Sequence, residues 1–243
     1  MVSVPSGLLT CFERFEVLRT FSRIAGACAL AMGLLLIGLH GAAAAHGRTL
    51  LVFGDSLSAA YNLRVDQGWV ALLQKRLQIQ GYGYDTVNAS ISGETTSGGL
   101  ARLPRALALH RPAIVILELG ANDGLRGLPL ATTREHLAQM IELAERAGAK
   151  VLLLGIRLPP NYGPRYGDGF AMIYGELAAR FHLPLVPFLL QTVALHPELM
   201  QSDGLHPNAE GEGPVLETVW PYLVPMLKKA AAARGIPGRS AAN

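Results

Sequence analysis

A serine, an aspartate and a histidine occur in this chain with a spacing that suits acyl transfer. Ser56 ends the tripeptide Gly54-Asp55-Ser56, and Asp203 lies three residues before His206 in a loop marked by glycine and proline. A serine hydroxyl is a poor nucleophile at neutral pH and needs a neighbouring base, whose tautomer a third group must fix. In such a turn the Asp203 carboxylate can reach Nδ1 of His206 and leave Nε2 facing Ser56. These three residues are therefore predicted to form a catalytic triad.

Three further groups are expected to stabilise the negative oxygen that develops during acyl transfer. Ser56 follows an apolar run and precedes a segment expected to be helical, so its backbone N–H and the helix N-terminus would face that oxygen. The backbone N–H of Gly93 and the side-chain NH2 of Asn122 would supply the second and third donors. Ser56, Gly93 and Asn122 are thus the predicted oxyanion hole.

Each of these motifs taken alone also has an ordinary structural interpretation. Gly54-Asp55-Ser56 is compatible with a strand-to-helix turn, and Asn122-Asp123-Gly124 is a common turn tripeptide. Asp203 and His206 together are compatible with a surface turn and a helix cap. Their joint order along the chain and their placement at strand ends favour the catalytic interpretation, because the structural interpretations predict neither.

The elements that must position these residues alternate regularly between strand and helix. Apolar runs rich in β-branched residues predict strands, and segments with helical periodicity lie between them. The expected strands are residues 49–53, 86–91, 113–119, 150–156 and 185–188, and the expected helices are residues 67–80, 95–110, 132–148, 170–181 and 210–232. This alternation predicts an α/β fold, a three-layer α/β/α sandwich on a parallel five-stranded sheet.

The predicted fold explains why residues far apart in the chain would meet. Ligands of open parallel sheets bind at the carboxyl ends of the strands. Ser56 follows the first expected strand, Gly93 the second and Asn122 the third, while Asp203 and His206 come after the fifth. All of them are therefore expected at one rim of the sheet.

The N-terminus has the order of a secretory signal. Arginines precede the apolar run 24–39, and small residues at 41–45 provide an A-x-A cleavage site. We expect residues 1–45 to be a signal peptide, residues 46–232 the hydrolase domain and residues 233–243 a flexible tail. The alternative is an uncleaved membrane anchor, which requires roughly 20 apolar residues. The expected location is the periplasm or the outside of the cell, with no stable membrane span after cleavage.

Composition excludes several other classes of protein. Half of the 243 residues are hydrophobic, and the net charge of +3 is spread without a basic block, so nucleic acid is not expected as a partner. Both cysteines, Cys11 and Cys28, lie in the leader, so a mature chain has neither a thiolate nucleophile nor a disulfide. His196 with Asp203 and His206 could form a metal triad, but no HExxH or cysteine spacing supports this interpretation. We expect a monomer without metal or cofactor that acts on a small-molecule acyl ester or thioester.

Four sequence blocks resemble the SGNH (GDSL) hydrolase superfamily, and within it a group of bacterial periplasmic acyl-CoA thioesterases also described as lysophospholipases and arylesterases. The blocks are Gly54-Asp55-Ser56-Leu57, Gly93 within Ala89–Thr95, Gly120-Ala121-Asn122-Asp123 and Asp203-Gly204-Leu205-His206-Pro207. The likeness covers about residues 49–230. Two departures are Ala121, where the group often has a second glycine, and the stretch after Pro207.

The resemblance implies a flavodoxin-like sheet and a role for each site residue. Ser56 would be the nucleophile, His206 the general base and acid, and Asp203 the residue that orients His206. The implied substrates are acyl-CoA thioesters, aryl esters and lysophospholipids, cleaved without metal or cofactor. The flexible loop after the fourth strand would be a flap over the acyl groove, with substrate-binding residues Leu158, Pro159, Pro160, Asn161 and Tyr162.

Two other functions remain open from the sequence. The same machinery suits a deacetylase of carbohydrate or envelope glycan, which would accept only short acetyl esters. A non-catalytic acyl or lipid carrier on the same fold is the alternative outside enzymes. The physiological substrate is open, because an apolar groove discriminates each methylene by only about 1–3 kcal/mol.

Overall fold

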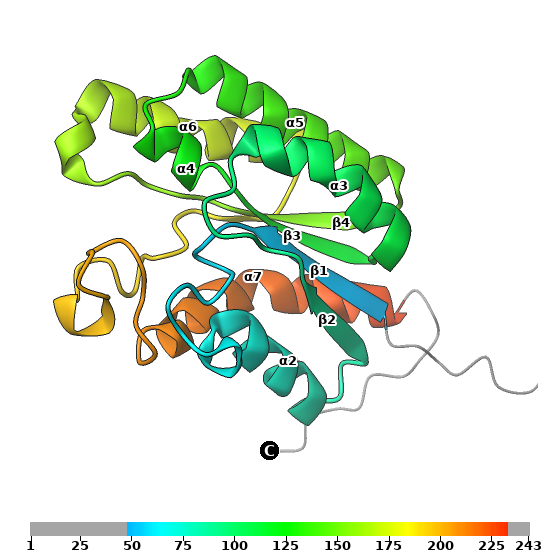
Figure 1. The fold of residues 1–243 in the computed structure, drawn as a ribbon. Helices are drawn as coiled ribbons and strands as arrows, with labels where there is room; N and C mark the ends of the chain where they lie inside the picture. The colour runs from blue at the N-terminus through cyan, green and yellow to red at the C-terminus, as the bar shows by residue number, and fades with distance from the viewer. Residues whose placement is uncertain (1–47, 233–243) are drawn as a thin grey trace, which may run out of the picture. The chain divides into compact units, whose positions relative to one another are not determined.

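The computed structural model describes residues 48–232, and the expected signal peptide and the tail 233–243 lie outside the described residues. Five strands and six α-helices alternate within this part of the chain (Figure 1). The strands are β1 (Arg48–Gly54), β2 (Tyr84–Asn88), β3 (Ile114–Glu118), β4 (Lys150–Leu154) and β5 (Leu185–Val186). The helices are α2 (Trp69–Ile79), α3 (Thr96–His110), α4 (Ala121–Leu125), α5 (Leu130–Arg146), α6 (Pro164–Phe181) and α7 (Glu212–Ala232).

The sheet is parallel throughout and its strands lie in the order β2-β1-β3-β4-β5. Figure 1 shows α3, α4, α5 and α6 on one face of the sheet and α2 and α7 on the other. The predicted three-layer α/β/α sandwich is therefore confirmed, and the strand order is that of flavodoxin-like sheets. Strands β1 and β3 are hydrogen-bonded neighbours, but the chain leaves β1 towards α2 on one face of the sheet and β3 towards α4 on the other, so the strand order reverses between them.

The apolar runs form strands here because both faces of the sheet are covered. Leu50–Phe53 of β1 are completely buried, and so are Leu152–Leu154 of β4. Strands buried on two faces read as continuous apolar runs rather than as an alternating pattern. Helix α5 buries one stripe, including Leu137, Met140 and Ile141, against the sheet. The core thus holds the carboxyl ends of β1 and β3 rigidly beneath the site.

Several element boundaries differ from the sequence prediction. Helix α6 begins at Pro164, not at residue 170, because proline suits the first position of a helix, where its missing N–H is not needed. The loop after β4 is correspondingly shorter than residues 157–169. Helix α5 begins at Leu130 without a side-chain cap, and the short helix α4 was not predicted. Strand β2 starts earlier, at Tyr84, because it pairs with the first residue of β1.

No helix within residues 48–232 is long and apolar enough to span a lipid bilayer.

Helices α2 and α7 are joined by a buried carboxylate. Glu212, the first residue of α7, is almost fully buried, and its Oε2 accepts the N–H of Trp69, the first residue of α2, at 2.7 Å. Burial raises the pKa of the Glu212 carboxyl to about 7, although the hydrogen bond from Trp69 lowers it. The negative form of Glu212 is therefore unfavourable in the folded chain.

Replacing Glu212 by glutamine is expected to remove a pH-dependent loss of stability. A carboxyl pKa raised on folding stabilises the fold fully below the unfolded value of 4.5, and this contribution is lost as pH rises through about 7. The loss is on the order of 3 kcal/mol in the free energy of unfolding. In urea unfolding, the free energy of unfolding of Glu212→Gln relative to that of wild type should therefore rise from about pH 5 to about pH 8. The exposed Glu145→Gln is the control, and a pH-independent difference between Glu212→Gln and wild type would contradict the prediction.

Candidate active site

The structure brings the three predicted triad residues into one hydrogen-bonded chain. Ser56 Oγ lies 2.8 Å from His206 Nε2, and His206 Nδ1 lies 2.6 Å from Asp203 Oδ2. Asp203 Oδ1 accepts the backbone N–H groups of Leu205 at 2.9 Å and His206 at 3.1 Å. Both carboxylate oxygens of Asp203 are thus engaged, one with the loop backbone and the other with the imidazole.

The environment of Asp203 keeps it charged. Partial burial raises its pKa, but hydrogen bonds from the N–H of Leu205 and from the ring and N–H of His206 outweigh that effect and leave the pKa of Asp203 below its usual value. The carboxylate therefore stays ionised through neutral and mildly acidic pH. An ionised acceptor at Nδ1 places the proton there and leaves Nε2 able to accept a proton from Ser56.

Ser56 is positioned by a tight turn, and the helix predicted to follow it is absent. The carbonyl of Asp55 accepts the N–H groups of Ser58 and Ala59, and the next α-helix begins only at Trp69. The expected contribution of an α-helix N-terminus to the oxyanion hole is therefore wrong. The first turn of backbone after Asp55 leaves only the N–H of Ser56 itself for that role.

A buried glutamate supports this turn from below. Glu118, the last residue of β3, accepts the N–H of Asp55 at 3.2 Å and the hydroxyl of Ser58 at 2.8 Å through Oε2. A Cβ on Gly54 would lie 2.5 Å from the same Oε2 and 2.9 Å from the Glu118 carbonyl. The glycine before Asp55 is therefore required by the close approach of Glu118.

Asp55 and Glu118 are both completely buried and lie close to each other. Burial raises the pKa of Asp55 to about 7, against hydrogen bonds from the N–H of Leu57 and the amide of Asn122 that lower it. Burial, and next the charge of Asp55, raise the pKa of Glu118 well above its usual value. The pair therefore carries less than two full negative charges at neutral pH, which limits the cost of burying it.

The predicted oxyanion donors lie around the same turn. Asn122 lies in the first turn of α4, and its Nδ2 donates to Asp55 Oδ2 at 3.1 Å and to the carbonyl of Glu94 at 3.0 Å. This amide thus connects the turn that carries Ser56 with the loop that carries Gly93. Gly93 has φ +80°, a conformation that favours glycine, and Arg126 donates to its carbonyl at 3.1 Å.

The loop after β4 lies against α4. Leu158 packs so closely on the helix that a Cβ at Gly124 would lie 2.6 Å from its Cδ2. Residues Pro160–Tyr162 form a 3-10 helix, and the hydroxyl of Tyr162 donates to the carbonyl of Leu125 at 2.8 Å. Pro159 is half-buried, whereas Pro160 and Asn161 are exposed. Of the predicted substrate-binding residues, Leu158 and Tyr162 therefore contact the helix that carries Asn122.

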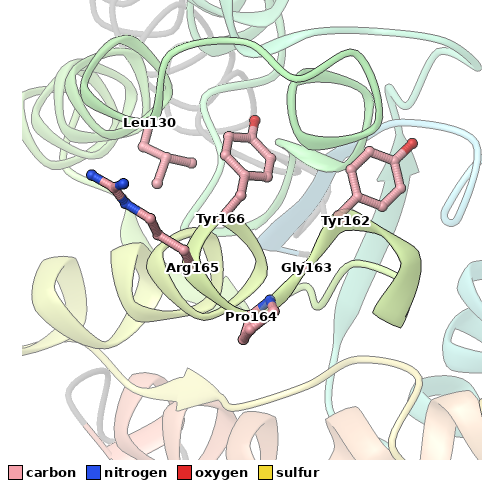
Figure 2. Close-up of a pocket in the computed structure, with 6 residues that line it drawn as sticks. All are labelled: Leu130, Tyr162, Gly163, Pro164, Arg165 and Tyr166. Atoms are coloured by element: carbon pink, nitrogen blue, oxygen red, sulfur yellow. The ribbon is translucent and has the colours of Figure 1, made fainter.

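A cavity of about 370 Å³ opens beside this loop. Figure 2 shows the side chains of Tyr162 and Tyr166 rising from the 3-10 helix and from the start of α6. The hydroxyl of Tyr166 donates to the carbonyl of Leu128 at 2.7 Å, so Tyr166 is held by the α4–α5 connection and Tyr162 by the last residue of α4. The lining residues are Leu130, Tyr162, Gly163, Pro164, Arg165 and Tyr166.

Sequence reasoning missed three residues that surround the triad. Glu118 is the single charged residue in the apolar run 113–119, and a lone charge in a buried strand was a usable signal. The ring centroids of Tyr61 and His206 lie 4.6 Å apart. The side chain of Gln201 hydrogen-bonds to the loop that carries Ser56 and to the loop that carries His206. No local sequence pattern marks Tyr61 or Gln201 as a neighbour of the triad. His196, the third member of the alternative metal triad, hydrogen-bonds through Nδ1 to Glu198 at 3.1 Å.

Residues 52–213 match the GDSL-like lipase/acylhydrolase family. The chain belongs to this family. It is 56% identical over 183 residues to esterase TesA of Pseudomonas aeruginosa, covering 75% of this chain and 91% of the relative. It is 45% identical to thioesterase 1/protease 1/lysophospholipase L1 of Escherichia coli K12, covering 76% of this chain and 87% of the relative.

A solved structure supports the same family assignment. The psychrotrophic esterase EstA of Pseudoalteromonas sp., in a structure inhibited by monoethylphosphonate, superposes with a TM-score of 0.71 and 38% identity. The match covers 74% of this chain and 99% of that one. The predicted family and fold are therefore confirmed, and the matched GDSL region contains every residue of the hydrogen-bonded site described above.

Proposed function

We propose that this GDSL-family chain is a serine hydrolase that cleaves carboxylic esters and thioesters through an acyl-enzyme on Ser56. The observation that carries the proposal is the continuous hydrogen-bonded chain from Asp203 through His206 to Ser56. Such a chain activates a hydroxyl that would otherwise be too weak a nucleophile. The relatives named esterase TesA and thioesterase 1/protease 1/lysophospholipase L1 support this class of reaction.

In the proposed reaction, Ser56 Oγ attacks the acyl carbonyl carbon while its proton passes to His206 Nε2. The carbonyl π electrons move to the oxygen, which the N–H of Ser56, the N–H of Gly93 and the NH2 of Asn122 stabilise. The tetrahedral intermediate expels the alcohol or thiol, which takes the proton from His206. A water molecule then repeats the sequence on the acyl-enzyme, releases the acid and restores Ser56. Asp203 stabilises the imidazolium in both halves without itself taking up a proton.

Asn122 is held ready for this role by its two acceptors. The bond to Asp55 Oδ2 fixes the amide plane beside the turn of Ser56, and the bond to Glu94 prevents the amide from rotating away. Because both amide hydrogens are already engaged, stabilising an oxyanion requires one of them to be shared or transferred. The position of the amide is thus fixed before the reaction, while one of its two hydrogen bonds must be redirected to the oxyanion.

Substituting Asn122 by alanine is expected to lower kcat about 10²- to 10³-fold, because one donor to the developing oxyanion is lost. KM should change much less, since the ground-state carbonyl needs that donor less than the transition state does. Steady-state kinetics on a p-nitrophenyl ester measure both constants. The exposed Gln78→Ala, on α2 and outside the site, is the control for loss of a side-chain amide. An unchanged kcat for Asn122→Ala would remove Asn122 from the oxyanion hole.

We propose acyl-CoA thioesters, aryl esters and lysophospholipids as the substrate classes. The contact of Leu158 with α4, the helix that carries Asn122, and the cavity beside Tyr162 support an acyl-binding surface along the loop after β4. We further propose that Leu158, Pro159, Pro160, Asn161 and Tyr162 contact the acyl chain as a flap beside this cavity, which Tyr162 itself lines.

The test of the proposed function is a panel of p-nitrophenyl esters and acyl-CoAs of increasing chain length. Mass spectrometry after treatment with a serine-directed phosphonate is run in parallel and should place one adduct on Ser56. Hydrolysis of medium or long chains supports the esterase and thioesterase proposal. Activity confined to acetyl esters would identify a deacetylase instead. Neither hydrolysis nor a phosphonate adduct would overturn the proposal and favour an acyl carrier.

We propose that the enzyme works outside the cytoplasm as a monomer. The cationic and apolar leader 1–45 and the absence of cysteine after residue 45 support the location. The triad and the oxyanion donors all come from a single chain, so the proposed catalysis requires no second subunit. Fractionation of cells and size-exclusion chromatography of the mature protein test the two statements.

A further inference from the structure

The two halves of the triad lie on loops that the sheet does not hold together. Ser56 follows β1, whereas Asp203 and His206 lie in the long connection between β5 and α7, 150 residues further along the chain. Figure 1 shows both segments beyond the same end of the sheet. The separation of Ser56 Oγ from His206 Nε2 therefore depends on contacts between these two loops.

The side chain of Gln201 makes this connection. Its Nε2 donates to the carbonyl of Tyr61, in the turns after Ser56, and to the carbonyl of Pro207, next to His206, both at 2.9 Å. Its Oε1 accepts from Nδ2 of Asn62 at 3.4 Å. Both amide hydrogens and the amide oxygen of one side chain are thus used between the two loops.

The turn that Gln201 contacts has an unusual backbone. Ala60 and Asn62, on either side of Tyr61, both have φ +57°, the left-handed region that residues other than glycine rarely adopt. This conformation presents the carbonyl of Tyr61 to Gln201 and the ring of Tyr61 to His206. The strained backbone is therefore retained where the turn meets the histidine loop.

The histidine loop also has internal bonds that do not involve the Gln201 side chain. The backbone N–H of Gln201 donates to the carbonyl of His206 at 2.7 Å, and its carbonyl accepts the N–H of Gly204 at 2.9 Å. Asp203 holds His206 directly at 2.6 Å. Removing the side-chain amide should thus leave the Asp203–His206 pair intact, while it releases the link to the turn of Ser56 and one bond within the histidine loop, to the carbonyl of Pro207.

We propose that Gln201 is a positioning residue that sets the distance between His206 and Ser56. This inference rests on the proposed function, because that distance matters only if Ser56 transfers its proton to His206. Displacing a catalytic group by about 1 Å can cost about 10²-fold in rate. Gln201 contacts neither Ser56 nor the oxyanion donors, so its effect on catalysis acts through the placement of the two loops.

The test compares Gln201→Met with wild type, since methionine keeps the length of the side chain and removes its hydrogen bonds. We expect kcat on a p-nitrophenyl ester to fall about 10- to 100-fold while KM stays within about twofold. The low-field NMR signal of the His206 Nδ1 proton should persist, because Asp203 still holds the ring. Gln139→Met, on the exposed face of α5, is the matched control and should behave as wild type.

A second variant keeps the test decisive if Gln201→Met does not fold. Asn62→Gly removes only the 3.4 Å bond to Gln201, and glycine readily adopts φ +57°, so this variant should fold and lose kcat by a few-fold. The inference is overturned if folded Gln201→Met keeps its kcat, or if the Nδ1 signal disappears together with activity. Wild type that hydrolyses no ester would instead refute the proposed function, before any variant is compared.

Discussion

Hydrolysis by Ser56→Ala is expected to fall at least about 10⁴-fold in kcat, the largest effect of any single substitution in this chain. Alanine removes the oxygen that attacks the acyl carbon, and the remaining groups can only assist a water molecule. His206 and Asp203 lose their function together with Ser56, because the three act as one unit joined by bonds of 2.8 and 2.6 Å. Residual activity would come from the oxyanion donors and substrate binding alone.

The measurement combines ester hydrolysis with phosphonate labelling, because both reactions begin with attack by the Ser56 hydroxyl. Ser97→Ala, an exposed serine in the first turn of α3, controls for loss of a hydroxyl and should keep full activity. Thermal unfolding shows whether Ser56→Ala remains folded. A folded variant that hydrolyses esters at the wild-type rate would show that the nucleophile is another group.

The layered fold could be predicted from the sequence because its central strands are buried on both faces. Leu50–Phe53 and Ile114–Leu117 read as unbroken apolar runs, and helical periodicity separates them. The parallel order then places the ends of both strands at one rim. The local pattern thus determined which residues could meet, and Ser56, Asp203 and His206 do meet.

The supports of the triad could not be predicted because they depend on which loops meet in space. Glu118 bonds to the turn of Ser56 from 60 and 63 residues away, and Gln201 bonds to Tyr61 across 140 residues. No local preference for turn, helix or strand marks such partners. The sequence predicts a helix after Ser56, and this prediction is wrong for the same reason, since Glu118 and the left-handed residues Ala60 and Asn62 shape the turn.

These supports also explain where the buried charge in this protein lies. Glu118 holds the turn of Ser56, and Asp55 holds Asn122, so two buried carboxyl groups position the nucleophile and one oxyanion donor. Burying two such groups is costly unless they are hydrogen-bonded or neutralised, and their raised pKa values show partial neutralisation. Part of the stability of the fold is therefore given up to hold the site in place.

Asp203 differs in role from Asp55 and Glu118, because its charged carboxylate binds the ring of His206 and does not contact the turn of Ser56. Its Oδ1 accepts two backbone N–H groups, which an asparagine oxygen could still accept. The NH2 of that asparagine would then face His206 Nδ1 in place of Oδ2. A donor at this position forces Nδ1 to be the acceptor and puts the proton on Nε2, where it faces the hydroxyl of Ser56.

Asp203→Asn is therefore expected to lower kcat about 10⁴-fold while leaving the loop in place, since the wrong tautomer of His206 cannot take the proton of Ser56. Steady-state kinetics should show the loss in kcat, and far-UV circular dichroism should show an unchanged fold. Asp85→Asn, an exposed aspartate of β2, is the matched control. A loss of less than about tenfold would mean that His206 keeps its tautomer without Asp203, and that the carboxylate serves only to shape the loop.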